Sequence, residues 1–237
     1  MAAPDNSRLR ERNLRRILIA SSNPGKLREY QELASGSGGL QLELLPNFRD
    51  LPAFEESAPT FSENSAGKAL HYSKFASEMV LAEDSGLVVD ALRGAPGVHS
   101  ARYAGPNATD ADRNRKLLDE MRGKRGEERR ARFVCVTTIA HRGQAIAIFS
   151  DFAAGIITEE PCGDDGFGYD PVFLLPQIGR TFAQFSAHEK NQYSHRGRAF
   201  RKVIQFFLPA KYCDSSVVPA HPIAGKENSL PFDSIEG

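Results

Sequence analysis

The chain has 237 residues, of which 41% are hydrophobic and 25% charged, as is typical of a globular protein with a sizeable core. Its 30 basic and 30 acidic residues balance, so no basic excess favours binding to a polymeric nucleic acid. The three cysteines form no C-x-x-C pair, which argues against a zinc site and a disulfide framework and indicates reduced thiols in an intracellular, cytoplasmic protein.

The two ends of the chain differ in composition from its middle. Residues 1–15 are polar and Arg-rich without an apolar segment, so we expect a flexible extension rather than a secretory signal. Residues 210–237 are rich in Pro, Ser and Gly, and we expect a loosely ordered tail. No apolar run approaches the ~20 residues that cross a bilayer, so no membrane partner is expected. The sequence therefore predicts one folded domain over residues 16–209.

A strand is predicted over residues 16–20, and it runs into a loop of small polar residues. A helix follows over residues 26–33, where Leu27, Tyr30 and Leu33 recur at helical spacing. A strand end joined to a helix N-terminus is a favourable site for an anion, and Lys26 adds a positive charge there. The spacing is not that of a Walker A loop, so phosphate binding and a plain capped helix start both remain open.

The next part of the chain predicts a strand over residues 40–45, a loop over residues 46–59 and a helix over residues 60–80. Thr60 and Glu63 have the spacing of a capping box, which predicts the start of this helix.

Two adjacent carboxylates, Glu83 and Asp84, follow an apolar run. Ser85 and Gly86 are predicted to turn the chain before a second apolar run begins. Unpaired carboxylates beside buried residues are costly to desolvate, whereas hard divalent cations require carboxylate oxygens at a fixed point. This stretch therefore predicts a site for a divalent cation.

The second half of the chain predicts a helix over residues 109–121 and two strands over residues 132–140 and 144–154 that form a hairpin. A strand over residues 172–175 and a last helix over residues 198–208 follow. Helical and β segments joined by a central antiparallel hairpin predict an α/β (mixed α+β) fold on a mixed sheet.

A glycine-rich loop over residues 163–171 is predicted to be shaped for a ligand, because Phe167 and its backbone could cradle a ring. Lys190, His195 and Arg196 are cationic donors just before the last helix, although His195 and Arg196 could equally cap that helix or form a salt bridge there. Arg102 could anchor a loop or contact the substrate. A divalent cation that bridges carboxylates to phosphate, with hydrogen-bond donors and an aromatic side chain for a base, describes a nucleoside triphosphate site.

Five motifs occur in the order found in the inosine triphosphate pyrophosphatase family, which the chain resembles over residues 17–208. They are SSNPGK, FSENSAGKA, EDSGLVVDALRGAPGVHSARYAG, GFGYDPVF and SHRGRAF. The resemblance implies an elongated mixed sheet flanked by helices, with a cleft between two lobes. It also implies a house-cleaning, Mg²⁺-dependent hydrolase, active as a homodimer, that converts ITP, dITP and XTP to the monophosphate and pyrophosphate.

The resemblance also implies roles for individual residues. It places Asp84 as the catalytic acid and Lys26 beside it in catalysis. It places Glu55 and Asp84 on the metal, with Glu56 and Glu83 as neighbouring candidates. Substrate contacts are implied for Ser21, Ser22, Asn23, Pro24, Gly25, Lys26, Ser85, Phe167, Gly168, Tyr169, Asp170, Lys190, His195 and Arg196.

Two other functions compete with this interpretation. A catalytically idle nucleotide-binding or sensor module would use the same cleft, but it would not need the metal carboxylates. A related pyrophosphatase for pyrimidine or other modified nucleotides would need a different base loop.

Overall fold

The structure is a computed structural model that describes residues 15–35 and 39–208. The predicted N-terminal extension (apart from Arg15), the predicted tail and Pro209 lie outside the described residues. Seven strands form one sheet in the order β2-β1-β3-β4-β5-β6-β7. They are β1 (Arg15–Ile19), β2 (Leu40–Leu44), β3 (Met79–Val89), β4 (Arg130–His141), β5 (Gln144–Ile157), β6 (Phe173–Leu175) and β7 (Arg180–Thr181).

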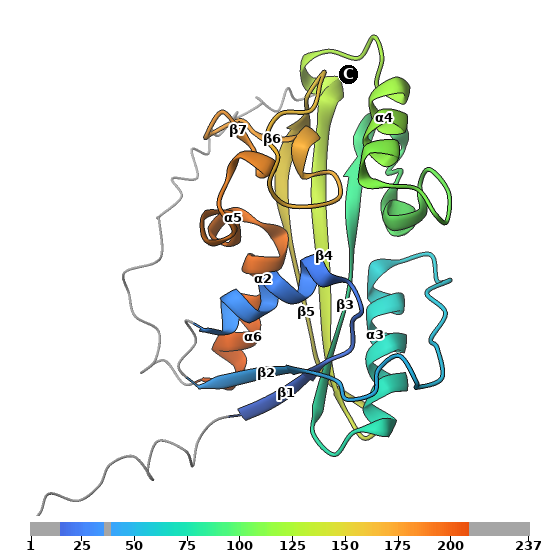
Figure 1. Cartoon of the computed structure of the whole chain (residues 1–237), viewed down its shortest axis with the longest axis vertical. Coiled ribbons are helices and arrows are strands. Elements are labelled where there is room, and N and C mark those ends of the chain that lie inside the picture. Colours follow the sequence, from blue (N-terminus) through green and yellow to red (C-terminus); the bar gives the residue numbers. More distant parts are fainter. Residues whose placement is uncertain (1–14, 36–38, 209–237) are drawn as a thin grey trace, which may run out of the picture.

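The sheet is mixed, as the sequence predicts. β1 pairs in parallel with β2 and with β3, whereas β3 to β7 pair antiparallel in succession. The strands β3, β4 and β5 are long and run along the long axis of the molecule (Figure 1). Positive φ angles at Arg142 and Gly143 form the tight hairpin turn between β4 and β5.

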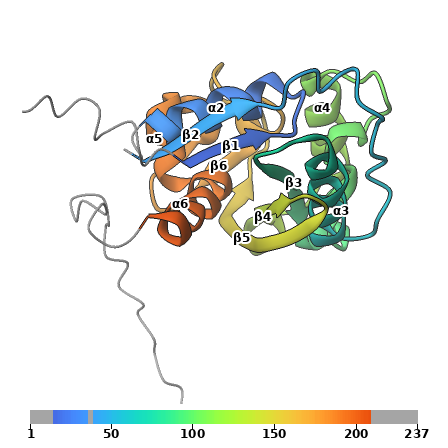
Figure 2. The same ribbon diagram turned by 90° about the horizontal axis from the view of Figure 1, so that it is seen from below.

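Five α-helices surround the sheet in the described part of the chain (Figures 1 and 2). They are α2 (Pro24–Ser35), α3 (Phe61–Tyr72), α4 (Asp110–Glu120), α5 (Ala187–Tyr193) and α6 (His195–Phe207). None of these helices combines the length and apolar character that a bilayer span requires.

Three apolar clusters fill the space between helices and sheet. At one end of the molecule, α2 and α6 cover the sheet face that carries Ile17, Ile19 and Leu81, and α3 covers the opposite face with Leu18 and Val80. At the other end, α4 packs with β3, β4, β5 and β6 in a third cluster. The alternation of side chains along β1 and β3 thus supplies both faces of the core.

The helix predicted over residues 60–80 is too long. Its capped start is confirmed, because the Thr60 hydroxyl accepts from the Glu63 N–H at 3.1 Å. The helix ends at Tyr72, however, and β3 begins at Met79. Met79 and Val80 pair with Ile17 and Leu18 of β1, so these residues belong to the sheet and not to the helix.

The last helix begins three residues earlier than predicted, at His195, because the Ser194 hydroxyl caps it by accepting from the Gly197 N–H at 3.0 Å. The hairpin strand β5 also continues to Ile157, three residues beyond the end predicted at residue 154. Its last two residues, Ile156 and Ile157, pair with β6, which explains the extension.

Candidate functional site

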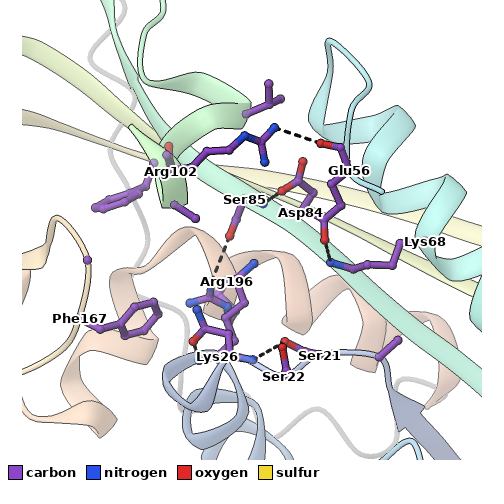
Figure 3. Close-up of a pocket in the computed structure, with 18 of the residues that line it drawn as sticks. Ser21, Ser22, Lys26, Glu56, Lys68, Asp84, Ser85, Arg102, Phe167 and Arg196 are labelled. Carbon is purple, nitrogen blue, oxygen red and sulfur yellow. Dashed lines mark hydrogen bonds and ion pairs between the residues drawn. The ribbon is translucent and has the colours of Figure 1, made fainter. Parts of the chain in front are cut away.

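A cavity of about 770 Å³ opens between the two ends of the molecule. Its walls come from the β1–α2 loop, the loop over residues 48–56, α3, β3, the segment before α4, and the residues around Phe167 and α6. Figure 3 shows Glu56, Asp84 and Lys68 on one side of this cavity and Phe167 on the other, with Lys26 and Arg196 between them. The cavity thus has an acidic wall and an aromatic wall.

The predicted anion loop lies at the end of β1, where α2 begins. Ser21, Ser22, Asn23 and Lys26 line the cavity. The Asn23 side chain caps α2 by accepting from the Lys26 N–H at 3.1 Å, and the Ser21 hydroxyl accepts from the Asn23 N–H at 3.2 Å. These bonds shape the loop and direct the helix N-terminus toward the cavity, where its dipole favours an anion.

Pro24 and Gly25 belong to the same sequence motif, but they are the first two residues of α2 and do not line the cavity. Pro24 is the first helical residue, where its missing N–H costs nothing. Gly25 lies against the ring of Phe167, and a Cβ atom there would be 2.6 Å from the ring. Gly25 therefore lets the aromatic wall contact the anion loop directly.

The turn predicted at Ser85 and Gly86 is absent, because β3 continues unbroken through both residues. Successive side chains of a strand point to opposite faces, so Glu83 and Asp84 separate. Glu83 lies on the α2 and α6 side with Arg196, whereas Asp84 lies on the α3 side, where Asn64 donates to it at 3.0 Å. Residues adjacent in sequence thus belong to two different environments.

Glu83 is part of a buried network of ion pairs. Arg196 donates to it from Nε at 2.7 Å and from a terminal nitrogen at 2.8 Å, and the Lys26 ammonium lies 3.2 Å away. Burial raises the pKa of Glu83, but these two cations outweigh burial and hold the pKa well below its usual range. Both Glu83 oxygens are already engaged, so this carboxylate positions Arg196 and Lys26.

Glu29 of α2 extends the same network, and it was not recognised in the sequence. It accepts from Arg196 and, at 2.6 Å, from the Lys190 ammonium, which also donates to Asp170 at 2.5 Å. Burial raises the pKa of Glu29, but Arg196 and Lys190 outweigh it and lower the pKa to about 2. An acid three residues after Lys26 on the buried side of α2 was the available signal.

Asp84 is the carboxylate that faces the cavity without a cation bonded to it. Its oxygens accept from the Asn64 amide and from the Ser85 N–H at 2.9 Å. Burial raises its pKa, and the nearby Glu56 carboxylate raises it further, against the lowering effect of Lys26. Asp84 is therefore more basic than an exposed aspartate, which suits a proton acceptor.

Glu56 and Glu55 differ in position. Glu56 lines the cavity and accepts from the Lys68 ammonium at 2.6 Å, whereas Glu55 is exposed and lies outside the lining. Lys68 and Asn64 lie four residues apart on one face of α3, a side that the sequence leaves open as solvated or site-facing, and their contacts with Glu56 and Asp84 make both functional candidates. Their spacing after the capping box was the signal for a shared face.

The glycine-rich loop over residues 163–171, called the base loop below, forms the aromatic wall. The Phe167 N–H donates to Asp170 at 2.8 Å, and the Lys190 ammonium lies 4.6 Å from the centre of the Phe167 ring. Tyr169 is buried, and its hydroxyl donates to the Ser100 carbonyl at 2.9 Å. Gly168 joins these residues with a positive φ of 65°. All four residues predicted for this loop line the cavity.

His195 and Arg196 line the cavity from the start of α6. The His195 ring stacks on Phe133 at 4.8 Å, and its Nδ1 is buried without a hydrogen-bond partner among the described residues. Burial and the charge of Arg196 hold the pKa of His195 well below its usual range, so the ring is neutral near pH 7. Ser85, the next residue on the Glu83 face, accepts from Arg196 at 3.2 Å.

Ser100 has a structural role. Its hydroxyl accepts from the Leu87 N–H at 2.9 Å and donates to the Gly97 carbonyl at 2.6 Å, which fixes the loop to β3. A Cβ atom on Gly86 would lie 2.4 Å from this hydroxyl, so the contact requires glycine. Arg102 donates to the Glu56 carbonyl at 3.1 Å and also lines the cavity, which joins two of its walls.

Comparison with known proteins gives consistent matches. A sequence profile of the Ham1 family matches residues 17–206. A dITP/XTP pyrophosphatase from Geobacillus kaustophilus is 46% identical over 190 residues, which cover 80% of this chain and 93% of the relative. One from Streptococcus thermophilus is 45% identical over 192 residues, which cover 81% of this chain but only 59% of that relative. The structure of a HAM1 protein from Coxiella burnetii superposes with a TM-score of 0.72 at 40% identity, covering 81% of this chain and 98% of that one.

Proposed function

The chain belongs to the Ham1 family, and we propose that it hydrolyses the non-canonical purine nucleotides ITP, dITP and XTP to the monophosphate and pyrophosphate. One observation carries the proposal. A single cavity joins an anion loop and an uncompensated carboxylate to an aromatic wall with hydrogen-bond donors. This arrangement provides for a triphosphate, a hydrolytic reaction and a purine base in one place.

Phosphate binding would rest on Lys26 and the N-terminus of α2. Lys26 is held by Glu83, and Lys68 approaches from α3, so two ammonium groups face the polyphosphate from different walls. Arg49 and Arg102 also line the cavity, and neither has a carboxylate partner among the described residues. Positive charges placed before the reaction stabilise the charge that develops on the departing pyrophosphate.

A divalent cation fits the acidic wall, although no cluster of three or more His, Cys, Asp or Glu side chains with metal-binding geometry occurs in the described residues. Asp84 and Glu56 are hard oxygen donors from two elements, and the raised pKa of Asp84 shows that its charge lacks full compensation. We therefore place Mg²⁺ on Asp84 and Glu56 together with the phosphates; Glu55 fits this role less well because it is exposed. Such an ion would neutralise phosphate charge and polarise the phosphoryl oxygens.

In the step we propose, water attacks the α-phosphorus while the bond from this phosphorus to the α–β bridging oxygen breaks. The bridging oxygen leaves with pyrophosphate and takes the bonding electron pair. Asp84 faces the cavity with a raised pKa and would accept the proton of the attacking water. Asn64 and the Ser85 N–H hold the Asp84 carboxylate in a fixed orientation for this step.

Base selection would follow from the few donors that remain free. Lys190 uses two of its three N–H groups, and Arg196 uses four of its five, so each retains one. Nδ1 of the neutral His195 ring is buried without a partner among the described residues, and we propose that the ring carries its proton on Nε2, as a third donor. These donors match the 6-oxo group of hypoxanthine or xanthine and oppose the 6-amino group of adenine.

Pyrophosphate release from a panel of nucleoside triphosphates tests the proposal. With Mg²⁺ present, we expect ITP and XTP to be hydrolysed with kcat/KM at least about 100-fold above that for ATP, because adenine sets donor against donor. Binding of ITP without turnover would indicate the idle sensor module. Preferred hydrolysis of a pyrimidine or another modified nucleotide would indicate the related pyrophosphatase.

Replacing Phe167 with Ala tests the aromatic wall. Stacking of a base on an aromatic ring contributes about 1–3 kcal/mol, so we expect KM for ITP to rise about 5- to 150-fold with a smaller change in kcat. Steady-state kinetics separate the two parameters. A lower kcat with unchanged KM would contradict a stacking role.

We further propose a homodimer in the cytoplasm. Ile146, Ile148 and Phe152 alternate along the exposed face of β5, and each is about half exposed, which leaves an apolar surface that a second copy could cover. Cys135 and Cys162 are free thiols, which fits a reducing compartment. Sedimentation of the protein as a monomer at micromolar concentration would contradict the dimer.

A further inference from the structure

We propose that α4 clamps the base loop, with Asp110 and Asn114 as positioning residues that determine how strongly the enzyme discriminates between purine bases. The inference rests on the proposed function, because it concerns the same cavity. Neither residue is part of the predicted site; Asp110 also lines the cavity, and both residues bond to the backbone of Gly168.

The clamp consists of two hydrogen bonds to the backbone of one residue. The Gly168 N–H donates to the Asp110 carboxylate at 2.7 Å, and the Asn114 amide donates to the Gly168 carbonyl at 3.0 Å. Asp110 and Asn114 are four residues apart, so they lie on the same face of α4. Gly168 adopts a left-handed conformation, which glycine populates without a steric penalty, so the two hydrogen bonds rather than backbone strain hold the loop.

The clamp is itself held in place. Arg113 of the same helix pairs with Asp110 and donates to the carbonyls of Ala101, at 3.0 Å, and Ala108. The Tyr169 hydroxyl adds a second tie from the base loop to the neighbouring Ser100 carbonyl. The base loop therefore connects to the segment over residues 97–102, which Ser100 bonds to β3, the strand of Asp84.

Movement of Gly168 would displace both groups that define the base end of the cavity. Phe167, on one side, supplies the ring that packs on Gly25. Asp170, on the other, uses one oxygen to accept both from the Phe167 N–H and from Lys190, at 2.8 and 2.5 Å. Lys190 is one of the donors that would meet the 6-oxo group, and a displacement of about 1 Å in such a constellation can reduce the rate by about 100-fold.

Helix capping does not account for Asp110. Thr109 is the N-cap of α4, and Asp112 completes the capping box by accepting from the Thr109 N–H at 3.0 Å. Asp110 directs one oxygen to Gly168 instead. Asp112 thus provides a matched control, since it is an aspartate in the same helical turn that does not contact the base loop.

Kinetics of Asp110→Ala, Asn114→Leu and Asp112→Ala with ITP and ATP test the clamp. We expect Asp110→Ala and Asn114→Leu to lower kcat/KM for ITP by about 10- to 100-fold, mainly through KM, and to narrow the ITP-to-ATP ratio of kcat/KM at least about 5-fold. Asp110→Asn, which keeps an acceptor, should recover most of the loss. Asp112→Ala should lower thermal stability and leave the ratio unchanged.

Hydrogen exchange of the nucleotide-free variants provides a readout that does not depend on turnover. Faster exchange at residues 166–170 in Asp110→Ala, but not in Asp112→Ala, supports the clamp whether or not the protein is active. If the wild-type protein hydrolyses none of the tested nucleotides, that result rejects only the proposed function. Equal exchange in both variants, or equal losses of kcat/KM for ITP and ATP in Asp110→Ala, would overturn the clamp proposal.

Discussion

Replacement of Asp84 with Asn is expected to reduce kcat/KM for ITP by at least about 1,000-fold while the protein stays folded. The amide cannot accept the proton of the attacking water and is a poor ligand for a divalent cation. The fold should survive, because the Asp84 carboxylate is buried without a bonded cation and its charge contributes little to stability. Pyrophosphate release and thermal unfolding of the same preparation measure the two quantities.

Glu55 and Glu56 provide the matched comparison for this experiment. Glu56→Gln removes a carboxylate from the cavity wall and should also lower turnover and raise the Mg²⁺ concentration required for half-maximal activity. Glu55→Gln changes an exposed neighbour and should behave like the wild type. The reverse pattern would support Glu55, as the sequence interpretation placed it, and an Asp84→Asn variant with near-normal turnover would reject Asp84 as the base.

Replacement of Arg196 with Met is expected to cause the largest loss of stability. It leaves Glu83 and Glu29 buried without their main cation, and breaking a buried pair in this way costs about 3–5 kcal/mol. For a chain of this length, such a loss lowers the melting temperature by roughly 10 °C. Calorimetry or circular dichroism measures the change in melting temperature. The control is Arg198→Met, at a neighbouring arginine that donates to the exposed Phe152 carbonyl of β5. An Arg196→Met melting temperature within about 2 °C of the wild-type value would contradict the role of this network in stability.

The same network predicts a loss of stability in acid. Glu29 has a pKa of about 2 in the folded protein, below its ordinary value of 4.5. A lowered pKa contributes stability above 4.5, and this contribution is lost as the pH falls from 4.5 toward 2. Urea midpoints measured over this range should therefore fall more steeply for wild type than for Arg196→Met, in which Glu29 has already lost its main cation.

The local features of the fold follow from the sequence. The polar loop between a β-branched run and a helical repeat predicts the anion loop at Lys26, and the capping box of Thr60 and Glu63 predicts the start of α3. The glycine-rich run predicts the shape of the base loop around Phe167. These features depend on residues a few positions apart, so their physical causes, which are periodicity, capping and turn preference, lie within each segment.

Only the tertiary structure decides how these segments combine. The pairing of β3 with β1 and β4 removes the predicted turn and sends Glu83 and Asp84 to opposite faces of the sheet. Arg196 meets Glu83 from 113 residues away, which no local pattern could reveal. Burial raises the pKa of both adjacent carboxylates, but Arg196 and Lys26 reverse this effect at Glu83 and make it strongly acidic, whereas Asp84 stays more basic than an exposed aspartate. The sequence by itself thus determined which chemical groups the protein carries and the local helix, strand or loop that holds each of them. Long-range packing decided which groups face one another, because charge and burial act through space rather than along the chain.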